Sequence, residues 1–203
     1  MRIFLFLTSL FVNFFMLASA VQAHDHAAML AMQNESTLPG ESLHRLAFPL
    51  TDQQGKSFHL ADEHGPATIV TMFYGDCQIA CPIAIENVKR TIDALPVAQR
   101  KQVRALMISL NPGVDTAASL AKLAKLHELS PSQFRLAVAA NDTQTRQLAA
   151  SLGIKYRRAA NGEINHSTRF VAVDSHGLIV GSSEQLSVEP DPKLLAAIAQ
   201  TLP

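Results

Sequence analysis

The chain has 203 residues, and its 17 lysines plus arginines balance 17 aspartates plus glutamates, so its formal net charge is zero. The sequence contains no cluster of basic residues, which argues against a nucleic-acid partner. It has only two cysteines, too few to frame a small secreted fold with disulfides.

Residues 1–23 have the pattern of a secretory signal peptide. A positively charged start is followed by a mostly apolar segment over 3–17 and then by small residues that end in an A-x-A-like sequence. An uncleaved membrane anchor is the alternative, although the apolar segment is short for a span and contains Asn13. The sequence therefore predicts export, most simply to a bacterial periplasm, with residues 24–43 as a flexible lead-in and residues 44–203 as one domain.

The domain alternates patterns of strands and helices. A turn signal at 52–55 predicts a first hairpin, and mostly apolar segments typical of buried strands lie at 67–73, 103–110 and 134–139. Helical patterns follow each strand, at about 82–95, at 115–129 with an Asp/Thr cap, and at 141–153. A second hairpin over 168–183 and a helix over 191–202 complete the chain. This order predicts an α/β fold with a central mixed sheet flanked by helices.

Both cysteines lie in the segment FYGDCQIACPIAIENV, where a buried strand is expected to give way to a helix. The N-terminus of a helix stabilises a negative charge, which lowers the pKa of a thiol and makes it a better nucleophile or metal ligand. Asp76 opposes this effect because a neighbouring carboxylate disfavours a second negative charge. With three residues between them, Cys77 and Cys81 should present their sulfurs on roughly the same side.

Three roles are open to this pair: a structural disulfide, a redox pair and a soft metal site. A disulfide across so short a loop would contribute only about 2–3 kcal/mol through the unfolded chain, which makes the structural role the weakest. In an oxidising compartment two neighbouring thiols close to a disulfide unless a reductant or a metal keeps them apart.

Four segments resemble the Sco/SenC family, whose thioredoxin-like domains carry C-x-x-x-C-P after a buried strand. They are VTMFYGDCQIACPIAIENV, FPLTDQQGKSFHLADEHG, LMISLNPGVDTAASLAKLAK and INHSTRFVAVDSHGLIV, and they follow one another in the family's order over about 44–185. The resemblance implies a thioredoxin-like fold with an N-terminal β-hairpin extension. It also implies that Cys77, Cys81 and the distant His166 bind copper. Three positions depart from the family's pattern, with Gln78, Asn111 and Asn165 where Pro, Asp and Asp are common.

A site of two thiolates and one imidazole suits copper, since soft sulfur ligands select Cu(I) and imidazole also suits Cu(II). Zinc is the main rival, but it would require a fourth ligand that the sequence does not clearly offer. No proline precedes Thr168, which leaves room for the His166 imidazole to face the sulfurs. The other histidines of the domain are expected in ordinary strand, turn or helix-end positions: His59, His64, His127 and His176.

A second, weaker metal site is conceivable at the N-terminus. If cleavage follows Ala23, the new terminus begins His24-Asp25-His26, and its amine, amides and third-position imidazole could hold Cu(II) in a square plane. Met29 and Met32 would suit Cu(I). The alternative is an ordinary polar lead-in.

The resemblance implies a periplasmic copper chaperone that serves the copper-site subunit of cytochrome c oxidase or another periplasmic copper or thiol protein. The sequence leaves open whether the protein is an enzyme. A metallochaperone would have no turnover, whereas a thiol–disulfide oxidoreductase would. A membrane is a partner only if the N-terminal segment stays uncleaved. The alternative is a thiol–disulfide oxidoreductase in which Cys77 attacks, Cys81 resolves and His166 tunes the thiolate.

Overall fold

The computed structural model describes residues 40–63, 65–77 and 79–203. The strands are β1 (Leu50–Asp52), β2 (Ser57–Phe58), β3 (Ala67–Phe73), β4 (Val103–Ser109), β5 (Phe134–Ala139), β6 (Tyr156–Arg158), β7 (Ile164–His166), β8 (Phe170–Asp174) and β9 (Ile179–Ser183). The α-helices are α2 (Ala80–Asp93), α3 (Val97–Arg100), α4 (Ala117–Leu126), α5 (Asp142–Ser151) and α6 (Pro192–Thr201), and two 3₁₀ turns are η1 (Leu43–Arg45) and η2 (Leu60–Asp62).

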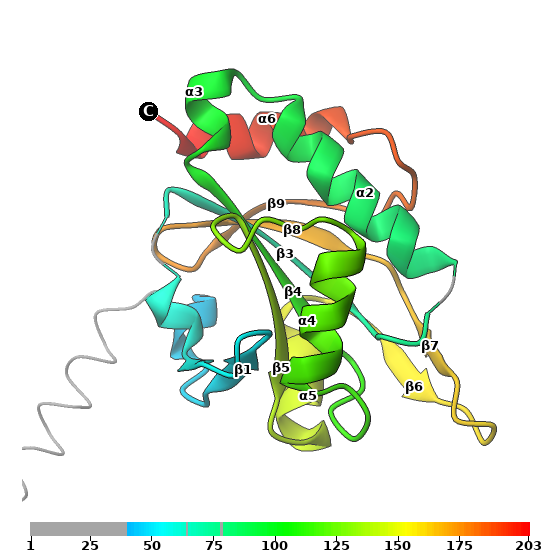
Figure 1. The fold of residues 1–203 in the computed structure, drawn as a ribbon. Helices are drawn as coiled ribbons and strands as arrows, with labels where there is room; N and C mark the ends of the chain where they lie inside the picture. Colours follow the sequence, from blue (N-terminus) through cyan, green and yellow to red (C-terminus); the bar gives the residue numbers. More distant parts are fainter. Residues whose placement is uncertain (1–39, 64, 78) are drawn as a thin grey trace, which may run out of the picture.

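Seven of the strands form one twisted sheet in the order β2-β1-β5-β4-β3-β8-β9 (Figure 1). β3, β4 and β5 are parallel, whereas β1, β8 and β9 pair antiparallel to their neighbours, so the predicted mixed sheet is confirmed. The first hairpin is not an appendage, because β1 pairs with β5 and lengthens the sheet at that edge. The remaining two strands, β6 and β7, form a small sheet of their own.

The sheet is buried on both faces, which explains the nearly continuous apolar sequence of its central strands. All seven residues of β3 are buried, and they alternate between two cores. Ile69 and Phe73 face the core formed with α2, α4 and α6. Val70 and Met72 face the second core, which α5 and the N-terminal 3₁₀ turns cover. The carboxyl ends of β3, β4 and β5 meet at one edge, where parallel α/β sheets usually place their sites.

The predicted strands and helices lie where the sequence places them, apart from small differences at their ends. The main differences are β6 and β7 in the segment before β8 and the four-residue helix α3, none of which is predicted. Strands of three residues are too short for a recognisable alternation, and two of the three β6 residues are exposed. His166 therefore ends β7, a strand that was not predicted, and also precedes β8 of the main sheet as expected.

Two residues of the predicted lead-in pack against the domain. Leu43 is buried in the second core, and the Ser42 hydroxyl donates to the carbonyl of His176 at 2.6 Å. The predicted signal segment lies outside the described residues. Among residues 40–63, 65–77 and 79–203, no helix has the length and apolar character that crossing a bilayer requires.

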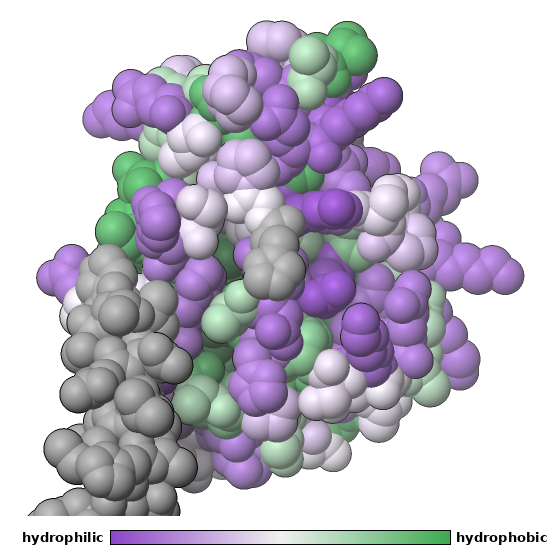
Figure 2. Space-filling model, turned by 90° about the vertical axis from the view of Figure 1, so that its left-hand side faces the viewer, coloured by the Kyte–Doolittle hydropathy of each residue, from purple (hydrophilic) through white to green (hydrophobic). Residues whose placement is uncertain are grey.

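Hydrophobic side chains occur only in small, separate areas on the face that lies on the left in Figure 1, which is otherwise largely hydrophilic (Figure 2). Exposed hydrophobic side chains also lie near the cysteine loop. Ile79 is 78% exposed, and Val114 and Leu126 are also well exposed. The last two line a hollow of about 260 Å³ together with Gly75 and Asp76 of the cysteine loop.

Candidate metal centre

The two cysteines lie where β3 leads into α2, as the sequence predicts. Cys77 is half-buried in the connecting loop, and Cys81 is buried in the first turn of α2. Both are free thiols. Pro82 follows in the same turn, where a missing N–H group costs the helix little.

The two sulfur atoms are adjacent, which confirms the expectation that they share a side. The backbone N–H of Cys81 donates to Cys77 Sγ at 3.3 Å, and the two thiols also hydrogen bond to each other. The Cys81 thiol donates to the carbonyl of Tyr74, with 3.5 Å between Sγ and oxygen. The arrangement allows either a disulfide or joint contact with one soft ion.

The pKa values of the two thiols move in opposite directions. Burial acts to raise the pKa of Cys77, but hydrogen bonds from the Cys81 thiol and from the backbone N–H groups of Cys81, Ile79 and Ala80 outweigh it, so the pKa is lowered. Burial raises the pKa of Cys81 well above its ordinary value, and the charge of Cys77 adds to the effect. Cys77 is thus the more acidic thiol of the pair, and Cys81 is the less acidic one.

His166 is half-buried at the end of β7, on the side of the loop where Tyr74 lies. Its imidazole meets the ring of Tyr74 edge to face, with 5.9 Å between the ring centroids. Its Nδ1 lies 3.1 Å from the carbonyl oxygen of Ser167. Burial lowers the pKa of His166 although this hydrogen bond acts in the other direction, so the neutral imidazole predominates at neutral pH.

Tyr74 connects the histidine to the cysteines, and the sequence reasoning did not identify it. Its hydroxyl hydrogen bonds to Cys77, and its pKa is raised by burial and by the charge of Cys77. Its carbonyl accepts hydrogen bonds from the N–H of Cys77 at 3.2 Å and from the Cys81 thiol. Its place three residues before Cys77, in the same short loop, was the available signal.

The three predicted ligands are therefore neighbours, but they do not converge on one point. Within the described residues, no group of three or more His, Cys, Asp or Glu side chains is arranged so that it could hold a metal ion. The two sulfurs are adjacent, and Tyr74 contacts both the His166 ring and Cys77.

A buried carboxylate in the loop between β4 and α4 fixes the cysteine loop. Asp115 accepts hydrogen bonds from the N–H of Gly75 at 3.0 Å and from the hydroxyl of Ser109. The sequence predicted that an Asp/Thr pair would cap α4, but only Thr116 acts as the cap. Asp115 is drawn into the interior instead because its carboxylate satisfies these donors, and it lies so close to Gly75 that position 75 has no room for a side chain.

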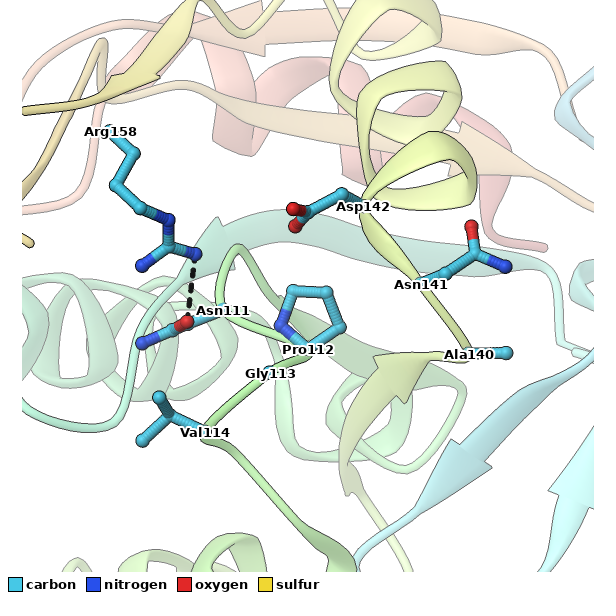
Figure 3. Close-up of a pocket in the computed structure, with 8 residues that line it drawn as sticks. All are labelled: Asn111, Pro112, Gly113, Val114, Ala140, Asn141, Asp142 and Arg158. Carbon is cyan, nitrogen blue, oxygen red and sulfur yellow. Dashed lines mark hydrogen bonds between the residues drawn. The ribbon is translucent and has the colours of Figure 1, made fainter.

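Asn111, one of the departures from the family pattern, is buried in the same loop. Its side-chain oxygen accepts a hydrogen bond from the guanidinium of Arg158 at 2.9 Å (Figure 3). The two residues line a pocket of about 390 Å³ that the start of α5 closes on the other side, with the carboxylate of Asp142 pointing into it (Figure 3). The other departure in the described residues, Asn165, is exposed on β7.

The remaining histidines lie away from this centre or outside the described residues. His59 follows β2 and precedes η2, which differs from the predicted strand position. His127 ends α4 and His176 lies in the β8–β9 turn, as predicted. The pKa of His127 is lowered, mainly by burial and also by Lys89, and both effects disfavour the charged form. His24, His26, His64 and Gln78 are not among the described residues, and the N-terminal copper site stays a prediction.

Several proteins of known structure share this fold. The SCO1/SenC lipoprotein of Bacillus anthracis superposes with a TM-score of 0.64 at 18% identity, over 76% of this chain and 90% of its own. The copper-bound ScoI of Bradyrhizobium japonicum superposes with a TM-score of 0.59 at 21% identity, over 76% of this chain and 94% of its own. These likenesses confirm the thioredoxin-like α/β class.

Sequence comparison gives the same relationship. A Stutzerimonas stutzeri protein whose name describes it as copper-binding is 25% identical over 166 residues, which cover 78% of each chain. The SCO1/SenC family model matches residues 36–202, a range that includes both cysteines, Tyr74 and His166. The chain belongs to the SCO1/SenC family.

Proposed function

We propose that this protein is an exported copper carrier that holds copper between Cys77 and Cys81 with His166 as the third ligand. Copper is the cargo, taken up and passed to a partner protein. The observation that carries the proposal is the adjacent sulfur pair, in which hydrogen bonds already stabilise one thiolate. The copper-bound structure of a family relative supports the choice of metal.

The donor set fits Cu(I). Two thiolates and an imidazole are ligands of the softness that this ion prefers. His166 is neutral at neutral pH and has a free nitrogen besides Nδ1, while Cys81 must lose its proton when the metal enters. Tyr74 contacts both His166 and Cys77, so loading also requires that its ring move aside and that the His166 imidazole turn toward the sulfurs.

The recipient is proposed to be a protein with its own thiolates, such as the copper-site subunit of a cytochrome c oxidase. Transfer would proceed by exchange of sulfur ligands at the exposed edge of Cys77. The apolar side chains of Ile79, Val114 and Leu126 around this edge suit a transient protein contact. The signal-like N-terminal segment supports a periplasmic location.

A thiol–disulfide oxidoreductase is the second candidate, and the lowered pKa of Cys77 favours it. The Cys77 thiolate would attack a partner disulfide, form a mixed disulfide and release one partner thiolate. Cys81, after losing its proton, would attack Cys77 Sγ, release the second partner thiolate and leave an intramolecular disulfide. The partner would gain two electrons, and the protein would need a reductant to return to the dithiol.

A Cu(I) competition titration tests the first proposal. Reduced protein would be titrated against a chelator of known affinity, as wild type and as the Cys77→Ser, Cys81→Ser, His166→Ala and His176→Ala variants. We expect one equivalent of Cu(I) to bind, either cysteine change to abolish tight binding, and His166→Ala to weaken it about tenfold or more. His176, in an exposed turn, is the matched control and should behave like wild type.

Two results would decide against the copper assignment. Weak binding that is unchanged in His166→Ala would contradict the ligand set. Reduction of a model disulfide that survives His166→Ala but is lost in Cys77→Ser would favour the oxidoreductase.

A further inference from the structure

We propose that the hydrogen bond between Arg158 and Asn111 is a latch that sets the position of His166 relative to the cysteine loop. Both would be positioning residues, since neither touches the sulfurs. The proposal deepens the copper function proposed above, and its effect on copper binding depends on that function.

The latch acts on a small hairpin that has little support of its own. β6 and β7 pair only with each other, through three residue pairs, and are not part of the main sheet. An isolated two-stranded hairpin is marginally stable in water, so contacts with the rest of the domain must determine where it lies. Tyr156 is paired with His166 at one end of this ladder, and Arg158 with Ile164 at the other.

Apolar contacts hold the hairpin to the domain without fixing its direction. Ile164 is buried in the second core, and Tyr156 packs against the same core with its hydroxyl buried and unpaired. Hydrophobic contact is non-directional, so these two side chains keep the hairpin attached but do not fix its orientation relative to the domain. The Arg158 guanidinium supplies a directed contact, a charge-assisted hydrogen bond of 2.9 Å to the side-chain oxygen of Asn111.

The other end of the latch is rigid. Asn111 is only 6% exposed, and its backbone N–H donates to the Ser109 hydroxyl at 2.9 Å. Its backbone carbonyl accepts from the N–H groups of Val114 and Asp115. Asn111 is thus fixed in its loop on three sides before Arg158 reaches it.

The same loop also holds the cysteines in place. Asp115, four residues after Asn111, accepts from the N–H of Gly75, two residues before Cys77. The β4–α4 loop is therefore a common support: Asp115 binds the segment that carries the sulfurs, and Asn111 binds the hairpin that carries the imidazole. Two ligand-bearing segments fixed to one rigid loop keep a constant relative position, which a transient metal site requires.

A measurement without copper tests the latch directly. The ring protons of His166 lie in the ring-current field of Tyr74, and their NMR signals can be identified by their absence in His166→Gln. In metal-free Arg158→Ala we expect these signals to move toward those of an exposed histidine. Arg157→Ala, which removes the exposed arginine next to it on β6, should leave them in place, and so should Asn111→Asp, which keeps the acceptor oxygen. Because Arg158 is exposed, its loss should not unfold the protein.

A double-mutant cycle tests whether the latch acts through His166. Arg158→Ala should weaken Cu(I) binding about three- to tenfold in the wild-type background and leave it unchanged in the His166→Ala background. Equal effects in both backgrounds, or His166 signals unmoved by Arg158→Ala, would overturn the latch. If His166→Ala itself leaves Cu(I) affinity intact, the ligand assignment fails instead, and the NMR comparison alone decides the latch.

Discussion

The ring of Tyr74 meets the imidazole of His166 edge to face, with 5.9 Å between their centroids. This is a favoured geometry for two aromatic rings, and it holds the imidazole beside the cysteine loop without contact with the sulfurs. The tyrosine hydroxyl meanwhile hydrogen bonds to Cys77. Tyr74 thus contacts both His166 and Cys77, so any event that joins the three predicted ligands changes the surroundings of Tyr74.

The fluorescence of Tyr74 should therefore report copper loading. The chain has two tyrosines and no tryptophan, so in Tyr156→Phe all tyrosine emission comes from Tyr74. We expect addition of Cu(I) to reduced Tyr156→Phe to change this emission until one equivalent is bound. The Tyr74→Phe variant keeps only Tyr156, which packs in the second core, and should respond weakly. A stronger response from Tyr74→Phe would contradict the role of Tyr74 as the residue that contacts both His166 and Cys77.

The two cysteines should differ in reactivity with pH. The lowered pKa of Cys77 makes its thiolate available below the range of a free cysteine, whereas the raised pKa of Cys81 keeps that thiol protonated through neutral pH. A short pulse of iodoacetamide at pH 8, followed by peptide mass mapping, should modify Cys77 about tenfold faster than Cys81 or more. In denaturant the difference should vanish. Equal labelling of both thiols in the folded protein would rule out the hydrogen-bond account.

Much of this architecture could be predicted because its signals are local. The apolar segments of β3, β4 and β5 and the pattern of α2 identify a covered sheet, and the position of Cys77 and Cys81 between strand and helix follows from them. Their adjacency follows from the short spacing across the start of α2, where the N–H of Cys81 reaches back to Cys77 Sγ.

The contacts that complete the site could not be predicted because they join distant segments. Nothing in the sequence of the β4–α4 loop tells that Asp115 turns inward to bind Gly75, since Asp before Thr is also a common helix start. The hairpin with Arg158 and His166 has three-residue strands, below the length at which alternation is visible. The contacts of Tyr74 with the histidine and with Cys77 depend on how the cysteine loop packs against the β6–β7 hairpin, which residue propensities do not encode.

His166 should make the stability of the protein depend on pH. Burial lowers its pKa in the folded state, while in the unfolded chain the pKa returns to about 6.5. The unfolded chain therefore binds the proton more readily, so the stabilisation is present above about pH 6.5 and is lost as the pH falls through the lower, folded value. His127, whose pKa is also lowered, contributes with the same sign.

Urea unfolding of wild type and His166→Gln between pH 8 and pH 5 measures this dependence. We expect the free energy of unfolding to fall less steeply with decreasing pH in the variant, and least steeply when His127→Gln is combined with it. His176→Gln, an exposed residue of the β8–β9 turn, serves as the control and should follow wild type. A slope that is unchanged in His166→Gln would show that burial does not disfavour the charged imidazole.

The contact between Gly75 and Asp115 should make Gly75 the least replaceable glycine of the site. A Cβ atom built at Gly75 would collide with Oδ1 of Asp115, whose carboxylate is held by two hydrogen bonds and cannot easily move. We expect Gly75→Ala to lower the free energy of unfolding by about 1–3 kcal/mol and to displace the loop, so that the alkylation rate of Cys77 changes as well. Gly113→Ala is the matched control, since nothing lies within 4 Å of its added Cβ, and it should stay within about 0.5 kcal/mol of wild type.

A second substitution separates the collision from a general loss of glycine flexibility. Asp115→Ala alone should be destabilising, because it leaves the Ser109 hydroxyl and the Gly75 N–H without their buried acceptor, at about 1–3 kcal/mol. In the double variant Gly75→Ala/Asp115→Ala the added methyl group no longer meets a carboxylate. The loss in free energy of unfolding of the double variant should therefore be smaller than the sum of the losses of the two single variants. Strictly additive losses would mean that Gly75 is required for its backbone freedom and not for the space beside Asp115.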